Sequence, residues 1–153
     1  MNILPWNKKP EFFSVAETER IVAAIRSAGQ RTSGEVRVFV ESRCRFMDAV
    51  DRAAELFFHL KMDETAQRNG TLVYVAVRDH QAAVFGDEGI HQKVGQAYWD
   101  AEVQQMLYHF RQAHLADGLV QCVSDIVEAL HQHFPYDHGT DKNELPDEIV
   151  FGK

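Results

Sequence analysis

Hydrophobic and polar residues change their spacing several times along the chain, and each spacing predicts one kind of element. Residues 35–41 alternate valine with charged side chains, and residues 72–77 and 82–85 are short apolar runs, so three strands are predicted. Helical spacing covers residues 14–30, 47–62, 98–113 and 119–134, with one further turn expected at 91–94. Ser14 and Glu17 match a capping box at the first helix, and Pro135 ends the last one. This order predicts an α/β domain.

The connections predict how the strands pair. A helix joins strands 36–40 and 72–77, and a right-handed crossover of this kind makes the two strands parallel. Only the polar residues 78–81 separate strands 72–77 and 82–85, which favours an antiparallel hairpin. The sheet is therefore expected to be mixed. The starts of the first two strands and the end of the third should lie on one edge.

Three polar clusters fall on this expected edge, at residues 31–35, 68–70 and 86–89. Asp87 and Glu88, between two glycines that allow a tight bend, could meet a hard cation. Glu35 is a candidate for a second oxygen ligand, and the amide oxygen of Asn69 should project toward the same edge.

Each of these candidates also has a simpler interpretation. Asp87 could cap the following helix, with or without binding a cation. Glu35 could be an edge charge that keeps the sheet from aggregating, and the Asn69–Gly70 pair is ordinary turn chemistry. Arg68 could hold a phosphate or pair with Asp87, and Arg31 is a second candidate for phosphate.

Length, charge and cysteine spacing exclude several classes of protein. A chain of 153 residues fits one domain, expected over 1–135 with a polar, extended tail over 136–153, and a net charge of -7 argues against nucleic-acid binding. Cys44 and Cys122 have no metal-binding spacing, so two free thiols in a reduced compartment are expected. No signal peptide or membrane span is apparent, which favours a cytoplasmic protein.

Established catalytic signatures are absent from the sequence, including the Walker loop, the G-x-S-x-G elbow and H-E-x-x-H. The tail can be laid on a calcium-loop frame from Asp137 to Glu148. Lys142 stands where that loop needs glycine, and Pro146 interrupts it, so the frame is discounted.

Several motifs, taken in order, resemble the TPM domain family: T-S-G-E-V-R-V at 32–38, R-N-G-T-L-V-Y-V-A at 68–76, V-F-G-D-E-G-I at 84–90, Y-W at 98–99 and H-F-P at 133–135. The resemblance implies a three-layer α/β sandwich with a short central sheet flanked by helices. It also implies a divalent-cation site, calcium most often, at Glu35 and Asp87, with Asn69 and Glu88 as further contributors. For some members it suggests acid phosphatase activity.

Two functions follow as hypotheses. The first is a calcium-binding or magnesium-binding module that acts by contact with another protein. The second is a metal-dependent acid phosphatase, in which a cation activates water and Arg68 or Arg31 holds the phosphate. The sequence shows no recognisable nucleophile or general base, so the binding module is the preferred hypothesis.

Overall fold

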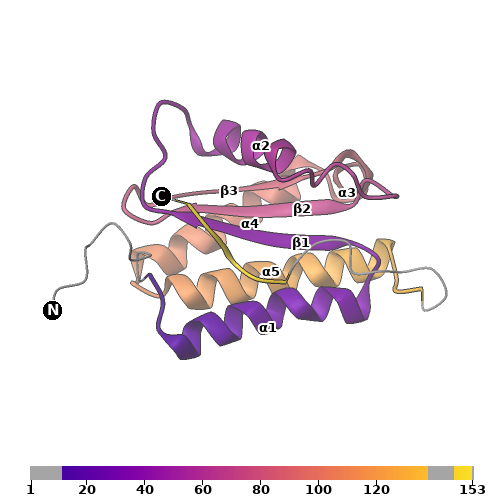
Figure 1. The fold of residues 1–153 in the computed structure, drawn as a ribbon, viewed down its shortest axis with the longest axis horizontal. Coiled ribbons are helices and arrows are strands. Elements are labelled where there is room, and N and C mark those ends of the chain that lie inside the picture. The colour runs from indigo at the N-terminus through magenta and orange to yellow at the C-terminus, as the bar shows by residue number, and fades with distance from the viewer. Residues whose placement is uncertain (1–11, 138–146, 153) are drawn as a thin grey trace, which may run out of the picture.

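The computed structural model describes residues 12–137 and 147–152 and shows the expected α/β fold (Figure 1). Its elements are, in order, α1 (Val15–Arg31), β1 (Glu35–Glu41), α2 (Ala49–His59), β2 (Gly70–Ala76), β3 (Gln81–Gly86), α3 (Glu88–Val94), α4 (Gln96–Arg111), α5 (Leu115–His133) and β4 (Val150–Phe151).

A local capping signal marks the start of α1, but other helices begin without one. At α1 the predicted capping box is present: the Glu17 N–H donates to Ser14 Oγ at 3.1 Å, and the Ser14 N–H donates to Glu17 Oε1 at 2.8 Å. The helix α5 begins at Leu115, earlier than the expected 119, and has no side-chain cap. Helix ends without a capping pattern are the boundaries that sequence locates least well.

The sheet has the order β3-β2-β1-β4 and is mixed. The strands β1 and β2 are parallel, with Glu35 opposite Gly70, and β2 and β3 are antiparallel, with Thr71 opposite Gly86. Both predicted pairings are confirmed. Every residue of β2 is buried, as its continuous apolar sequence indicated for a strand covered on both faces.

Helices cover both faces of the sheet and complete a three-layer sandwich. In Figure 1 the helix α2 lies above the sheet, α1 and α5 lie below it, and α4 passes behind the strands. Trp99, Met106 and Phe110 of α4 pack in the same core as α1 and α5, so these three helices form one layer. The valines of β1 and β2 pack against the larger helical layer, whereas Leu72 and Tyr74 of β2 face α2. No helix in the described ranges has the length and apolar character that crossing a membrane requires.

The polar face of β1 is buried rather than exposed. Glu35, Arg37 and Glu41, the charged residues that alternate with valine, are all buried. The burial of the Glu41 carboxylate is compensated by hydrogen bonds, because it accepts one from Arg52 Nε at 2.9 Å and one from the Tyr74 hydroxyl at 2.5 Å. Burial and this hydrogen bond raise the pKa of Tyr74, so its proton stays on the phenol.

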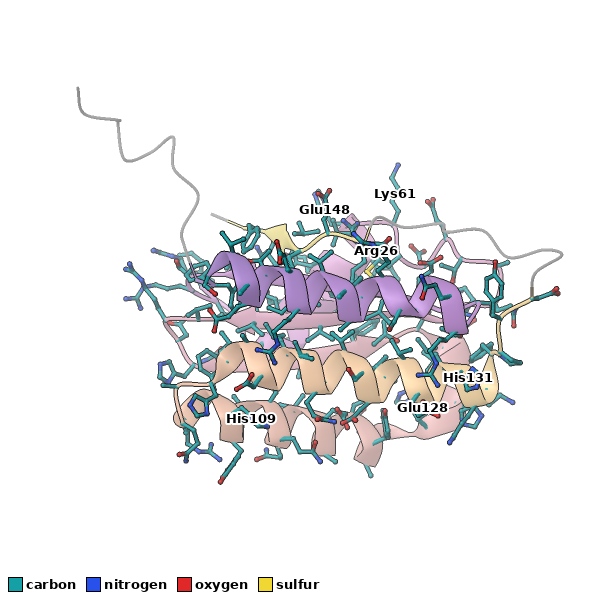
Figure 2. The ribbon with its side chains drawn as sticks, turned by 90° about the horizontal axis from the view of Figure 1, so that it is seen from below. Arg26, Lys61, His109, Glu128, His131 and Glu148 are labelled. Atoms are coloured by element: carbon teal, nitrogen blue, oxygen red, sulfur yellow. The ribbon has the colours of Figure 1, made fainter. Side chains whose placement is uncertain are left out.

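The end of the chain joins the domain. The strand β4 pairs in parallel with β1, and Ile149 is buried in the larger core. Asp147 lies 3.9 Å from Arg26 of α1, and Figure 2 shows Arg26 and the neighbouring Glu148 on the same side of the molecule. The discounted calcium-loop frame falls largely on residues 138–146, outside the described residues. Cys44 and Cys122 are both free, as expected.

Candidate functional site at the start of the parallel strands

Backbone hydrogen bonds join the polar clusters at one edge of the sheet. The Glu35 N–H donates to the Asn69 carbonyl at 3.4 Å, and the Asp87 N–H donates to the Gly70 carbonyl at 2.9 Å. These bonds continue the sheet pairing by one residue, Asn69 before β2 and Asp87 after β3. The mixed topology therefore brings Glu35, Asn69 and Asp87 together, although they lie far apart in the sequence.

Asp87 is held in two ways at once. Its Oδ1 accepts from the Glu88 N–H at 2.8 Å, which caps α3. Arg68 binds it with two nitrogens, Nε to Oδ2 at 2.7 Å and Nη2 to Oδ1 at 2.8 Å. The hydrogen bond with Asp87 raises the pKa of Arg68, so the guanidinium stays charged. The capping and pairing alternatives for Asp87 and Arg68 are both present.

The glycines beside Asp87 are needed for close approach. A Cβ at Gly86 would lie 2.4 Å from the Trp99 ring, and one at Gly89 would lie 2.2 Å from the Gln67 carbonyl oxygen. Neither glycine has a positive φ, and the residue here in the left-handed region is Arg68, with φ 51°. The glycines expected to allow a tight bend at 86–89 are therefore needed for a different reason: neighbouring segments pack too closely to leave room for a side chain.

The other candidates differ in exposure. Asn69 is buried, and its Nδ2 donates to Ser33 Oγ at 3.3 Å. Glu35 is buried at the start of β1. Glu88 is largely exposed, with Oε1 at 3.3 Å from Arg68 Nη1. A ligand set built from these residues would combine buried groups with one exposed carboxylate.

Arg31, the second phosphate candidate, is directed to the helical layer. Its Nη2 donates to Glu128 Oε2 at 2.7 Å, and its carbonyl lies 2.8 Å from His131 Nδ1. Figure 2 shows Glu128 and His131 on α5, the helix packed beside α1. Hydrogen bonding and attraction from Arg31 lower the pKa of Glu128. The structure thus joins Arg68, and not Arg31, to Asp87.

The donor set is incomplete for a cation in this conformation. Across 12–137 and 147–152, no three His, Cys, Asp or Glu side chains converge in an arrangement that could hold a metal ion. Both oxygens of Asp87 accept from Arg68. A divalent cation would have to take the place of the guanidinium.

A cleft of about 700 Å³ opens beside Asp87 and brings in residues that sequence reasoning missed. Among its lining residues are His91, Trp99 and Asp100. Trp99 Nε1–H donates to His91 Nδ1 at 3.0 Å, which leaves the His91 proton on Nε2. The four-residue spacing from Asp87 to His91 would have placed them on one side of a helix. Trp99 belongs to the Y-W motif at 98–99, but nothing in the sequence placed it beside Asp87, and Asp100 gave no local signal.

The chain is similar to proteins of known structure. A family model described as "TPM domain" matches residues 7–129. The structure of BA42 from Bizionia argentinensis is 39% identical, with a TM-score of 0.84 over 95% of this chain and 99% of BA42. Among curated proteins no significant match is found.

Two more distant structures share the fold. The N-terminal domain of cg2496 from Corynebacterium glutamicum is 14% identical, with a TM-score of 0.62 over 78% of this chain and 74% of that one. An N-terminal domain from P. gingivalis is 17% identical, with a TM-score of 0.68 over 82% of this chain and 83% of that one.

Proposed function

The chain belongs to the TPM domain family, and from this premise we propose that it is a divalent-cation-binding module that acts through contact with another protein. Calcium is the first candidate and magnesium the second. The proposed ligands are Asp87, Glu88, Glu35 and Asn69, which the mixed sheet gathers at one edge.

The observation that supports this proposal is the pair formed by Asp87 and Arg68. The Asp87 side chain is 4% exposed and fixed by its cap, whereas that of Arg68 is 40% exposed. Burial of a carboxylate is costly unless a positive group stays close to it. Arg68 is therefore a tethered cation whose side chain can leave toward water, and a divalent ion supplies the same compensation to Asp87.

The arrangement predicts weak binding. Calcium affinity rises with the number of charged ligands and with the rigidity of the site. Here Glu88 is exposed, and Arg68 competes for both oxygens of Asp87. When bound, the cation would order the loops that carry these residues and so present a defined surface to a partner.

A two-dimensional ¹H–¹⁵N NMR titration with calcium and with magnesium tests the proposal. We expect saturable shifts centred on Glu35, Asn69 and 86–89. Asp87→Asn keeps a capping side chain but should abolish the response. Arg68→Gln removes the competing guanidinium and should tighten binding severalfold. The matched control is Asp117→Asn, because Asp117 is also paired with an arginine, Arg20 at 2.8 Å, but on the helical layer.

The Asp87→Asn and Arg68→Gln variants test the site in two independent ways. If Asp87→Asn fails to fold, Arg68→Gln still distinguishes the outcomes, because only a cation that competes with Arg68 gains affinity from its removal. Unchanged affinity in Arg68→Gln, or shifts confined to the tail near Asp141 and Glu148, would reject this site.

The phosphatase alternative requires an arginine to hold the phosphate. Both candidates are engaged by carboxylates, Arg68 by Asp87 and Arg31 by Glu128. A phosphate would therefore have to replace an existing ion pair. This makes the hydrolase the second hypothesis.

A further inference from the structure

The strand β3 is an edge strand without the usual protection. It is the last strand on its side of the sheet, and no strand within the described residues pairs with its outer side. Its six residues, Gln81–Gly86, include no charged residue and no proline. Edge strands are normally protected by charges, proline or bulges, because their free N–H and C=O groups pair readily with other chains.

The register identifies the groups that face outward. Asp87 donates to the Gly70 carbonyl, and bonded and non-bonded pairs alternate in an antiparallel ladder. The N–H and C=O groups of Phe85 and Ala83 are therefore directed toward β2. Those of Ala82 and Val84 are directed toward the open side.

This edge forms the floor of the cleft beside Asp87, and helices form its walls. The α2 wall exposes two apolar side chains, Val50 at 62% and Phe58 at 52%. Trp99 and Val103 line the α4 wall. The small side chains of Ala82 and Ala83 keep the floor deep between the two walls. We call this cleft the β3 groove.

One end of the β3 groove is acidic. Asp87, Glu88 and Asp100 line it there with a single guanidinium, that of Arg68. Three carboxylates against one arginine leave a net negative end, and the whole chain has the same sign of charge. An occupant with a basic residue at this end gains from the complementary charge.

We propose that the β3 groove binds an extended segment of another protein, which adds to the sheet as a strand beside β3. Its backbone pairs with Ala82 and Val84, and its apolar side chains contact the two walls. A basic residue of the segment lies at the acidic end. A second copy of this chain fits less well, because the walls flank the edge and would meet the walls of the other copy.

This inference deepens the protein-contact half of the proposed function and requires no cation. Its test is a ¹H–¹⁵N NMR titration of the full chain in EDTA. The probe is a capped peptide of alternating valine and threonine with two lysines at one end. Matched peptides carry the lysines at the other end, or glutamates in their place. We expect saturable shifts along β3, α2 and α4, and about tenfold weaker binding of the glutamate peptides.

Two substitutions probe the walls and the charge. Phe58→Ser should weaken peptide binding about tenfold, because truncated aromatic anchors carry much of an interface's energy. Val15→Ser is its control, since Val15 is 77% exposed on α1. Asp100→Lys should reduce the preference for the lysine peptides, and Glu19→Lys, at an exposed position of α1, should not. Wild-type-like spectra establish that each variant is folded.

Several results would overturn the groove as a peptide site. These are no saturable binding of any peptide, shifts outside the groove, or an unchanged response in Phe58→Ser. A dimer in analytical ultracentrifugation that Phe58→Ser dissociates would assign the edge to a second copy instead. Peptide binding in EDTA together with no response to calcium would keep this inference and reject the cation site. A calcium response without peptide binding would keep the cation site and reject the peptide site in the β3 groove.

Discussion

At the scale of single residues, the fold buries acidic side chains in two different ways. Asp87 is paired with Arg68, which donates two hydrogen bonds to its carboxylate. Glu102, between α4 and α5, has no arginine, and its Oε1 finds no hydrogen-bond partner within the described residues. Burial, followed by the neighbouring Asp125 side chain, raises the pKa of Glu102 to about 8. A carboxyl in this setting keeps its proton.

Glu102 should therefore make stability depend on pH. The unfolded chain loses this proton near a pKa of about 4.3, whereas the native state keeps it up to about 8. The native state binds more protons in this window, so its stability is greatest below the unfolded pKa and falls as pH rises through the window. Glu102→Gln removes the titration and should flatten the profile, with a gain on the order of 1–3 kcal/mol near neutral pH.

Urea unfolding at several pH values measures this effect. Other groups facing Glu102 are Tyr98 and Cys122, and burial raises the pKa of both, so they stay neutral across the window. Glu19→Gln, on the exposed surface of α1, is the control. Equal slopes for the wild type and Glu102→Gln would contradict the assignment.

At the scale of elements, the two edges of the sheet differ. The strand β3 has six residues and forms the floor of an apolar groove, whereas β4 has only two. So short a strand contributes little through its own ladder. Its anchor is Ile149, which is 7% exposed and packed in the larger core. Ile149 thus attaches this segment of the polar tail to the domain.

Ile149→Ala should test this attachment. The lost contacts and the cavity that remains predict a free energy of unfolding lower by about 2–4 kcal/mol. Val15→Ala, at an exposed position, should change it by less than about 0.5 kcal/mol. Urea denaturation gives both values. A loss in Ile149→Ala as small as that in the control would mean that the segment does not contribute to the core in solution.

At the scale of the whole molecule, the polar groups gather at the two ends of the strands. The end at which β1 and β2 start, here called the strand-start edge, carries Asp87 and Arg68. Toward the other end, Glu41 of β1 accepts hydrogen bonds from Tyr74 of β2 and Arg52 of α2. Near Asp87, the Ser33 hydroxyl accepts from the amides of Asn69 and Gln67. An amide donor does not activate a hydroxyl as a general base would.

We therefore predict little or no turnover of simple phosphate esters. An assay of the purified chain with a chromogenic phosphate ester, with and without calcium, magnesium and manganese, should show no metal-dependent rate above background. Asp87→Asn is the diagnostic variant, and Asp117→Asn is the folded control. Metal-dependent turnover that disappears only in Asp87→Asn would replace the binding module with the hydrolase.

The sequence by itself determined β1, β2 and β3, their pairing and most of the helices, but not β4 or the start of α5. Valine alternation, the apolar run of β2, the short connection to β3 and the capping box at Ser14 each act over a few residues, so each can be identified locally. A helix between β1 and β2 fixes a parallel pair through the handedness of the crossover. The strand-start edge and its candidates, Glu35, Asn69 and Asp87, follow from these local facts.

Only the tertiary structure decided what those residues contact. The pairing of Arg68 with Asp87 and of Arg31 with Glu128 depends on the paths of separate segments. In the sequence both arginines were candidates for holding a phosphate. The β3 groove arises because α2 and α4 flank the edge strand, and Trp99 of α4 lines it. Such contacts depend on the packing of distant parts of the chain, which periodicity does not encode.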